Sequence, residues 1–278
     1  MIVDVHVHIL PPEVIKDIDH YKAKDEYFAL LHRDPKSRFA TAESVIEEMN
    51  RSGVDRSVVF GFAFKDMGIC RMLNDYVMDA VRRYPDRLIG FGVVDPLSSS
   101  VEREVLRCKE GGLVGIGELF PDGQGFNVGK PEDLKRFTSV CKEAGMIVSI
   151  HSNEPVGHYY EGKDSTYPEK AYRFALANPD LDIIFAHWGG GLFFYELMPE
   201  VRKALRRVFY DTAASPYLYT KEVYRVASAA GVVNKVLMGT DFPLIGQSRY
   251  IREIESSLLS GSEKTEILGG NAERLFDL

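Results

Sequence analysis

The chain has 278 residues, of which 45 % are hydrophobic and 27 % are charged, and its formal net charge is -7. This composition is typical of a folded protein with enough apolar material for a large core, and it excludes a mainly disordered chain. The negative net charge gives no general attraction for nucleic acid or for an anionic membrane, so we expect a small-molecule partner.

Short β-branched runs alternate with amphipathic helices along the whole chain. This alternation is typical of a parallel α/β fold. No glycine-rich phosphate loop follows any run, which disfavours a doubly wound nucleotide-binding sheet. A (β/α)8 barrel, or TIM barrel, commonly needs about 250 residues, so we expect one such domain over residues 1–278. The expected strands are 2–8, 55–61, 88–94, 114–119, 146–151, 182–187, 207–212 and 235–240.

The first expected strand has one apolar face and one polar face. Three valines alternate along it with Asp4, His6 and His8. In a barrel the apolar face meets the helices, so the two histidines would point inward near the C-terminal rim. Two imidazoles at i and i+2 can bind one metal ion, although histidines also occur as partly buried residues without one.

A connection of about thirty residues, from Leu10 to Ala40, separates the first strand from its helix. A loop of this length at about 10–40 predicts a lid or wall over the barrel mouth, and a surface excursion or oligomer contact is the alternative. The helix that follows should start after Thr41 and end before Gly53, because these residue types are common helix caps.

Ionisable residues mark the ends of four later strands. Glu118 closes VGIGELF, His151 closes MIVSIH, His187 closes DIIFAH, and Asp241 follows KVLMGT. Active sites of (β/α)8 barrels form at these strand ends, and several unpaired ionisable groups buried there would be costly without a metal or partners. Histidine and carboxylate ligands suit a divalent ion such as zinc, and open coordination positions are typical of a catalytic site.

The loops after the fifth and sixth strands supply candidate substrate contacts. Asn153, Glu154 and His158 follow the fifth strand, and Trp188, the single tryptophan, follows His187. We expect these four residues to bind substrate, because loops at this end of a barrel commonly do so. A hydrogen-bond network within the loop is the alternative for Glu154 and His158, and packing beneath the next helix is the alternative for Trp188.

These motifs resemble the amidohydrolase superfamily, in particular its amidohydrolase-related branch of metal-dependent hydrolases and non-oxidative decarboxylases. The resemblance covers nearly the whole chain, through DVHVHIL at 4–10, IHSNEPVGH at 150–158, AHWGGG at 186–191, GTDFP at 239–243 and GGNAERLFDL at 269–278. It implies that the metal ligands are His6, His8, His151 and Asp241. It also implies that His187 lies beside the metal, as a further ligand or as a polarising group.

The role of Glu118 differs between branches of the family that the chain resembles. In some branches a glutamate at this place bridges two metals. In the single-metal, decarboxylase-like branch the position is not a ligand, and Glu118 would instead hydrogen-bond a metal-bound histidine. Both roles stay open, so we expect one or two divalent ions, with zinc first and manganese or iron as the other candidates.

Hydrolysis of a small amide, ester or lactone is the reaction that we favour. A metal-activated water would attack a polarised carbonyl, with Asp241 as general acid and base and His187 stabilising the developing oxyanion. The alternative is non-oxidative decarboxylation of an unsaturated or aromatic carboxylic acid. That reaction needs a cationic clamp, for which the candidates are Arg33, Arg38, Lys163 and Arg249. A catalytically silent binding protein is the second alternative, but all the ligand positions are filled.

The remaining features concern location and assembly. No apolar run approaches the roughly 20 residues of a membrane span, and MIVDVHVHIL lacks a basic leader, which predicts a cytoplasmic protein without a membrane partner. The three cysteines, Cys70, Cys108 and Cys141, are far apart and are expected as buried free thiols. A homodimer is compatible with the fold, but no surface pattern establishes it.

Overall fold

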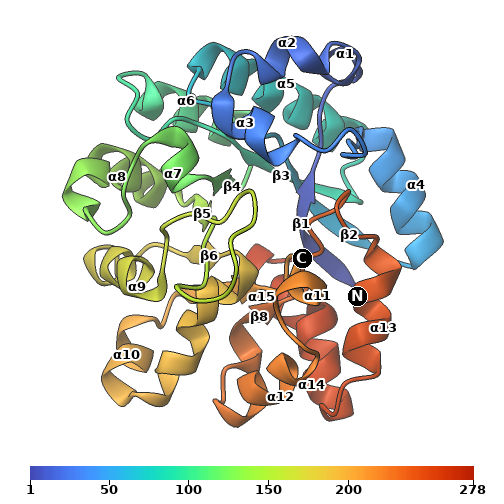
Figure 1. Ribbon diagram of the computed structural model, residues 1–278, viewed down its shortest axis with the longest axis vertical. Helices are drawn as coiled ribbons and strands as arrows, with labels where there is room; N and C mark the ends of the chain where they lie inside the picture. Colours follow the sequence, from blue (N-terminus) through green and yellow to red (C-terminus); the bar gives the residue numbers. More distant parts are fainter.

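The computed structural model describes residues 1–278, which form eight parallel strands surrounded by helices (Figure 1). Neighbouring strands pair in chain order, from β1 to β8, which confirms the predicted (β/α)8 barrel. Each strand lies within its predicted range and ends earlier than predicted at one or both ends. The strands are β1 (Val3–His8), β2 (Arg56–Phe60), β3 (Leu88–Gly92), β4 (Gly115–Leu119), β5 (Ile147–Ile150), β6 (Ile183–Phe185), β7 (Val208–Asp211) and β8 (Val236–Leu237).

Backbone hydrogen bonds beyond the two-residue strand β8 close the barrel against β1. Val5 N donates to Met238 O at 2.8 Å, and His8 N donates to Phe242 O at 2.9 Å. Asp241 N donates to the carbonyl oxygen of His6 at 3.0 Å. The closure therefore brings Asp241 beside the two histidines of β1.

The outer helices bury one face each against the strands, and α4 shows how the sequence sets their ends. The Thr41 side chain accepts a hydrogen bond from Ser44 N at the start of α4, and Gly53 ends the helix with a φ of 75°. The helices that cover the barrel are α4 (Ala42–Ser52), α5 (Met67–Arg83), α6 (Val101–Glu110), α8 (Lys135–Ala144), α9 (Pro168–Ala177), α10 (Pro199–Ala204), α12 (Glu222–Ala229) and α13 (Gln247–Glu255).

Shorter elements lie between the main helices and strands. Four are short α-helices: α7 (Pro121–Gln124), α11 (Ser215–Leu218), α14 (Gly261–Thr265) and α15 (Asn271–Phe276). Four are 3-10 or π-helical segments: η1 (Pro131–Leu134), η2 (His187–Leu197), η3 (Val233–Lys235) and η4 (Glu266–Gly270). None of the helices combines the length and the apolar character needed to span a bilayer.

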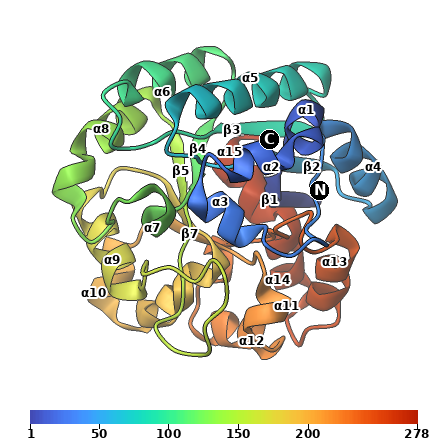
Figure 2. The same ribbon diagram turned by 45° about the horizontal axis from the view of Figure 1, so that its top comes forward.

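The long first connection contains three short helices, α1 (Pro12–Lys16), α2 (Ile18–Lys22) and α3 (Glu26–Leu31). Figures 1 and 2 both show α3 inside the ring of outer helices. Phe28 of α3 is fully buried, with its ring 4.8 Å from that of Phe62. The Tyr27 hydroxyl donates to Gly162 O at 3.2 Å, so this connection contacts the loop that follows β5.

The main core lies between the strands and the outer helices. The valines of β1 are buried there, as their alternation predicts. Cys70, Cys108 and Cys141 are free and buried within α5, α6 and α8, which confirms their predicted state.

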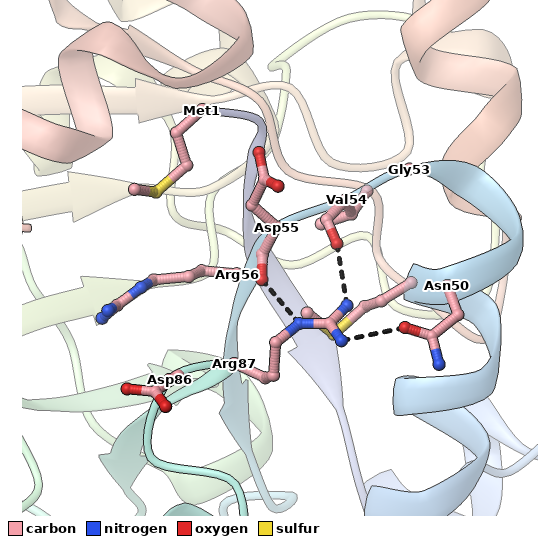
Figure 3. A pocket seen from close by; sticks show the side chains of 9 residues that line it. Met1, Asn50, Gly53, Val54, Asp55, Arg56, Asp86 and Arg87 are labelled. Atoms are coloured by element: carbon pink, nitrogen blue, oxygen red, sulfur yellow. Dashed lines mark hydrogen bonds between the residues drawn. The ribbon is translucent and has the colours of Figure 1, made fainter.

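A hollow of about 650 Å³ lies at the N-terminal end of the barrel, beside the first residues of β1, β2 and β3 (Figure 3). The Arg87 guanidinium lines it and donates to Asp55 O at 2.9 Å, Val54 O at 3.1 Å and Asn50 Oδ1 at 2.8 Å. The N–H donors of the guanidinium therefore find their acceptors within the protein itself. The predicted ligand residues lie at the opposite ends of the strands, so this hollow is separate from the candidate site.

Candidate metal centre

The six predicted ligand residues converge at the C-terminal ends of the strands. Their potential ligand atoms form two groups, each with its atoms within 4.8 Å of one another. The first ligand group is His6, His8 and Asp241, and the second ligand group is Glu118, His151 and His187.

In the first ligand group, the two histidines of β1 face Asp241 across the closure of the barrel. Nε2 of His6 and Nε2 of His8 are 3.3 Å apart. Oδ1 of Asp241 lies 3.7 Å from the first nitrogen and 3.5 Å from the second. These distances leave the three ligand atoms facing one shared point.

Glu118 belongs to the second ligand group but also faces the first. Its Oε2 lies 3.3 Å from Nε2 of His6 and 3.5 Å from Nε2 of His8. Its Oε1 lies 2.9 Å from Nδ1 of His151 and 3.4 Å from Nε2 of His187. One buried carboxylate therefore presents a different oxygen to each group.

The two histidines of the second ligand group are oriented by backbone carbonyls. Nε2 of His151 is 2.9 Å from Gly162 O, and Nδ1 of His187 is 2.9 Å from Ala213 O. A carbonyl oxygen only accepts hydrogen bonds, so in a neutral ring the proton lies on the nitrogen that faces it. The other nitrogen of each neutral ring then carries a free lone pair, and these two nitrogens, Nδ1 of His151 and Nε2 of His187, are 3.0 Å apart beside Glu118.

This arrangement of acceptors fits a divalent cation. Two nitrogen lone pairs and a carboxylate oxygen that face one point repel one another unless a cation or an extra proton lies between them. Burial opposes a positive charge on His151, but the Glu118 carboxylate outweighs it and raises the pKa of His151 to about 9. The site therefore favours positive charge, and nitrogen with carboxylate oxygen is a ligand set that zinc and manganese accept.

Access to the centre runs past the first ligand group. The side chains of His8 and Asp241 are 22 % and 17 % exposed, whereas those of His6 and Glu118 are 1 % and 2 % exposed. The side chain of His151 is 11 % exposed, so His8 and Asp241 form the most accessible side of the centre.

Left-handed backbone conformations also gather at the centre. His187, Trp188, Ala214 and Asp241 all have φ between 56° and 62°, and Asp277 is the single other non-glycine residue with a positive φ. Such conformations cost of order 1–3 kcal/mol each and are retained where the surrounding structure fixes them. Their concentration here is typical of a functional site.

Two buried carboxylates support the ligands from neighbouring positions. Asp4 accepts hydrogen bonds from Thr240 N at 3.0 Å and from Gln247 Nε2 at 2.9 Å, which ties β1 to the segment before Asp241. Burial raises the pKa of Asp4 to about 6, against these hydrogen bonds. Asp211, at the end of β7, lies 2.8 Å from Nδ1 of His6. The sequence signal for Asp4 is its place two residues before His6 on the inward face, and it does not by itself reveal the partners.

Aromatic rings that the sequence reasoning missed line the side of His8. The ring of Phe60 is 4.8 Å from that of His8, and the Phe120 ring is stacked with it at 6.4 Å. Phe62 stacks on Phe120 at 4.5 Å, and Tyr27 reaches the same ring at 5.5 Å. The signal for this cluster of rings is the phenylalanines at or just after the ends of the second and fourth strands, in FGFAF and ELF.

The predicted substrate contacts in the loop after β5 occupy different environments. Asn153 is buried, accepts from Asp164 N at 2.8 Å and donates to the Tyr160 hydroxyl at 2.6 Å. Glu154 is half-buried, and its Oε1 has no hydrogen-bond partner. His158 is exposed. Substrate binding by these residues stays a prediction.

Trp188 lies in the core rather than on the surface of the mouth. Its side chain is fully buried, its indole donates to Ser215 Oγ, and its ring is 5.4 Å from that of Tyr224. The left-handed turn that begins at His187 directs the indole inward. This position supports the packing alternative and gives no support to direct substrate contact.

The four cationic candidates contact groups other than the ligand residues. Arg33 is 3.8 Å from Glu161, and Lys163 donates to the carbonyl oxygens of Val156 and His158. Arg249 lies over the ring of Tyr217 at 5.9 Å. Arg38 lines a separate hollow of about 400 Å³ with Phe39, Phe242 and Pro243. No ion pair joins any of them to Glu118 or Asp241.

Comparisons with known proteins agree on the fold and the family. A family model described as amidohydrolase matches residues 3–278. No curated protein matches the chain in sequence. One similar solved structure is a 5-carboxyvanillate decarboxylase from Sphingomonas paucimobilis, with 17 % identity and a TM-score of 0.78 over 100 % of this chain and 99 % of that one. A 5-carboxyvanillate decarboxylase from Novosphingobium aromaticivorans, complexed with manganese, has 18 % identity and a TM-score of 0.77 over 100 % of this chain and 96 % of that one. A 2,6-dihydroxybenzoate decarboxylase from Rhizobium has 17 % identity and a TM-score of 0.73 over 99 % of this chain and 98 % of that one.

Proposed function

Because the chain belongs to the amidohydrolase family, we propose that it is a metal-dependent enzyme whose two ligand groups hold two divalent cations. The position of Glu118 carries this proposal. A carboxylate that only oriented one metal-bound histidine would need a single oxygen, whereas Glu118 presents one oxygen to each group. We therefore assign Glu118 as the shared ligand.

The ligand set is compatible with zinc and with manganese. Zinc is the cation that the sequence analysis puts first. Manganese gains support because it is bound in the related 5-carboxyvanillate decarboxylase from Novosphingobium aromaticivorans and in a dihydroxybenzoic acid decarboxylase from Polaromonas. Metal analysis of the protein as purified would decide between the two.

Hydrolysis of a small amide, ester or lactone is the first candidate reaction. Two cations held by these groups would supply the positive charge that lowers the pKa of a water molecule and polarises a carbonyl. Asp241 then accepts the proton of the attacking water and returns it to the leaving group, because its carboxylate is the acidic ligand that solvent reaches. His187 acts as a ligand in this arrangement, because its Nδ1 is bound to Ala213 O and only Nε2 faces the centre.

Non-oxidative decarboxylation is the second candidate, and the comparisons favour it over hydrolysis. The similar structures named above are decarboxylases of aromatic acids and match nearly the whole chain. The rings of Phe60, Phe62 and Phe120 make the surroundings of His8 apolar, but all three are buried, so they pack behind that histidine and do not by themselves favour either substrate. In this reaction Asp241 would first take up a proton from solvent and deliver it to the ring carbon. The electron pair of the bond between that carbon and the carboxylate would return to the ring as carbon dioxide leaves, and Asp241 would be left ionised.

A paired assay separates the two reactions. The protein, loaded with zinc or manganese, is tested on esters, lactones and amides, and in parallel on aromatic and unsaturated carboxylic acids with trapping of carbon dioxide. Hydrolysis by the wild-type protein that is lost in Asp241→Asn would support the first candidate. Carbon dioxide release that depends on Asp241, without hydrolysis, would replace the first candidate by the second.

A further inference from the structure

We infer that Asp211 is a positioning residue that fixes the proton of His6 and thereby keeps Nε2 of His6 available to a cation. Asp211 lies at the end of β7, a strand that contributes no ligand of its own, and its side chain is 1 % exposed. The inference rests on the two-cation site proposed above.

Both carboxylate oxygens of Asp211 are engaged by fixed donors. Oδ2 is 2.8 Å from Nδ1 of His6, in the first ligand group. Oδ1 accepts from His187 N at 2.9 Å and from Ala213 N at 3.0 Å. Ala213 O in turn accepts from Nδ1 of His187, in the second ligand group. The end of β7 therefore holds one histidine of each group.

The charge of Asp211 decides which nitrogen of a neutral His6 carries the proton. An ionised carboxylate only accepts hydrogen bonds, so the proton lies on Nδ1. Nε2 then carries a free lone pair, and this nitrogen faces Glu118, His8 and Asp241. Hydrogen bonds of this kind, from a carboxylate to the outer nitrogen of a ligand histidine, set ring orientation and basicity in metal sites.

An asparagine at position 211 would reverse this arrangement with little change in shape. Its amide oxygen would stay with the two backbone N–H groups, because its NH₂ group there would face two donors. The NH₂ group would then point at Nδ1 of His6, which would have to accept and would leave its proton on Nε2. That proton would lie between His6 and the cation position of the first ligand group.

The two obvious substitutions therefore have different expected effects. Asp211→Asn should weaken cation binding at the first ligand group by about 10- to 100-fold and leave the second group unchanged. Asp211→Ala also frees His187 N and Ala213 N, so it should weaken binding at both groups. Tyr210→Phe is the matched control, because Tyr210 is the preceding buried residue of β7 and its hydroxyl bonds to Glu196, away from the centre.

The test is a titration of the chelator-treated protein with manganese(II) alone, followed by electron paramagnetic resonance. We expect two bound ions with a spin-coupled signal in the wild type and in Tyr210→Phe. We expect one tight ion with an uncoupled signal in Asp211→Asn. Two ions bound to Asp211→Asn with wild-type affinity would overturn the inference. A wild type that binds no manganese in this titration, and that holds no zinc in the metal analysis of the purified protein, would overturn the proposed function itself.

A second measurement needs no variant and applies if Asp211→Asn does not fold. In the zinc-loaded wild-type protein with ¹⁵N-labelled histidine, nuclear magnetic resonance reports which ring nitrogen carries hydrogen. The inference requires a slowly exchanging proton on Nδ1 of His6. A ring with its proton on Nε2, or with Nδ1 bound to zinc, would contradict it.

Discussion

Both ends of the barrel carry buried or half-buried charged groups, but these groups find their hydrogen-bond and charge partners in different ways. At the N-terminal end, the Arg87 guanidinium finds three oxygen acceptors within the fold (Figure 3). At the C-terminal end, Glu118 and the lone pairs of His151 and His187 face one another. The first arrangement is complete without a ligand, and the second needs positive charge from outside the chain. We therefore assign stability to one end and chemistry to the other.

Removing the histidines of the first ligand group should have the largest effect. In His6→Ala combined with His8→Ala, the first cation loses two of its ligands, so we expect that cation and all activity to be lost while the fold remains. Metal content, turnover and circular dichroism would be measured together. Turnover at the wild-type rate in this variant would show that the reaction does not take place at the C-terminal end of the barrel.

Asp241→Asn should have the next largest effect. An amide can neither accept nor deliver the proton that both candidate reactions would move through Asp241. General acid–base catalysis typically contributes about 10²- to 10⁴-fold, so turnover should fall by that factor. Most of the metal should remain, because an amide oxygen can still occupy the position of Oδ1. Steady-state kinetics with metal analysis checks both parts, and loss of metal equal to that of the histidine variant would make Asp241 only a ligand.

Cation binding should stabilise the C-terminal end by a smaller amount. A ligand that binds only the folded protein adds about 2.7 kcal/mol at a free concentration 100 times its Kd. We expect chelation to lower the melting temperature of the wild type, and zinc or manganese to restore it. The same melting curves for His6→Ala combined with His8→Ala should respond less to either treatment, and an equal response would place the stabilising cation elsewhere.

Arg87→Ala should have the smallest effect and should act only on stability. Loss of the guanidinium leaves Val54 O, Asp55 O and Asn50 without their donor, which should cost about 1–2 kcal/mol in the free energy of unfolding. Urea denaturation measures this, with metal content and turnover as controls. If turnover fell by more than the folded fraction does, the N-terminal end would also contribute to the chemistry, and the assignment of stability alone to that end would be wrong.

The strand order and the ligand types could be predicted from sequence because they depend on local pattern. Alternation locates the strands, and residues such as His151 and Asp241 stand where strands end, where a barrel brings side chains together. The partners of Glu118 and Asp211 could not be predicted, because they depend on strand register and on which way each carboxylate oxygen points. These are properties of the closed barrel rather than of any single strand.

The placement of Trp188 shows a second limit of sequence reasoning. Its position after His187 predicts a place near the mouth, but the backbone from His187 to Gly191 has positive φ throughout and carries the indole into the core. At Gly190 a Cβ atom would lie 2.1 Å from Asn153 O, so the loops after β5 and β6 approach too closely for a side chain there. A run of glycines indicates such a turn but not its direction.

The most direct test is the number of cations per chain in the wild type and in Glu118→Gln. Plasma mass spectrometry on protein purified without a His-tag or chelator, and then supplied with zinc or manganese, gives that number. We predict two cations in the wild type and at most one in Glu118→Gln, because the amide cannot supply the shared negative charge. One cation in both proteins would contradict a shared Glu118 and would favour the single-metal site of a decarboxylase.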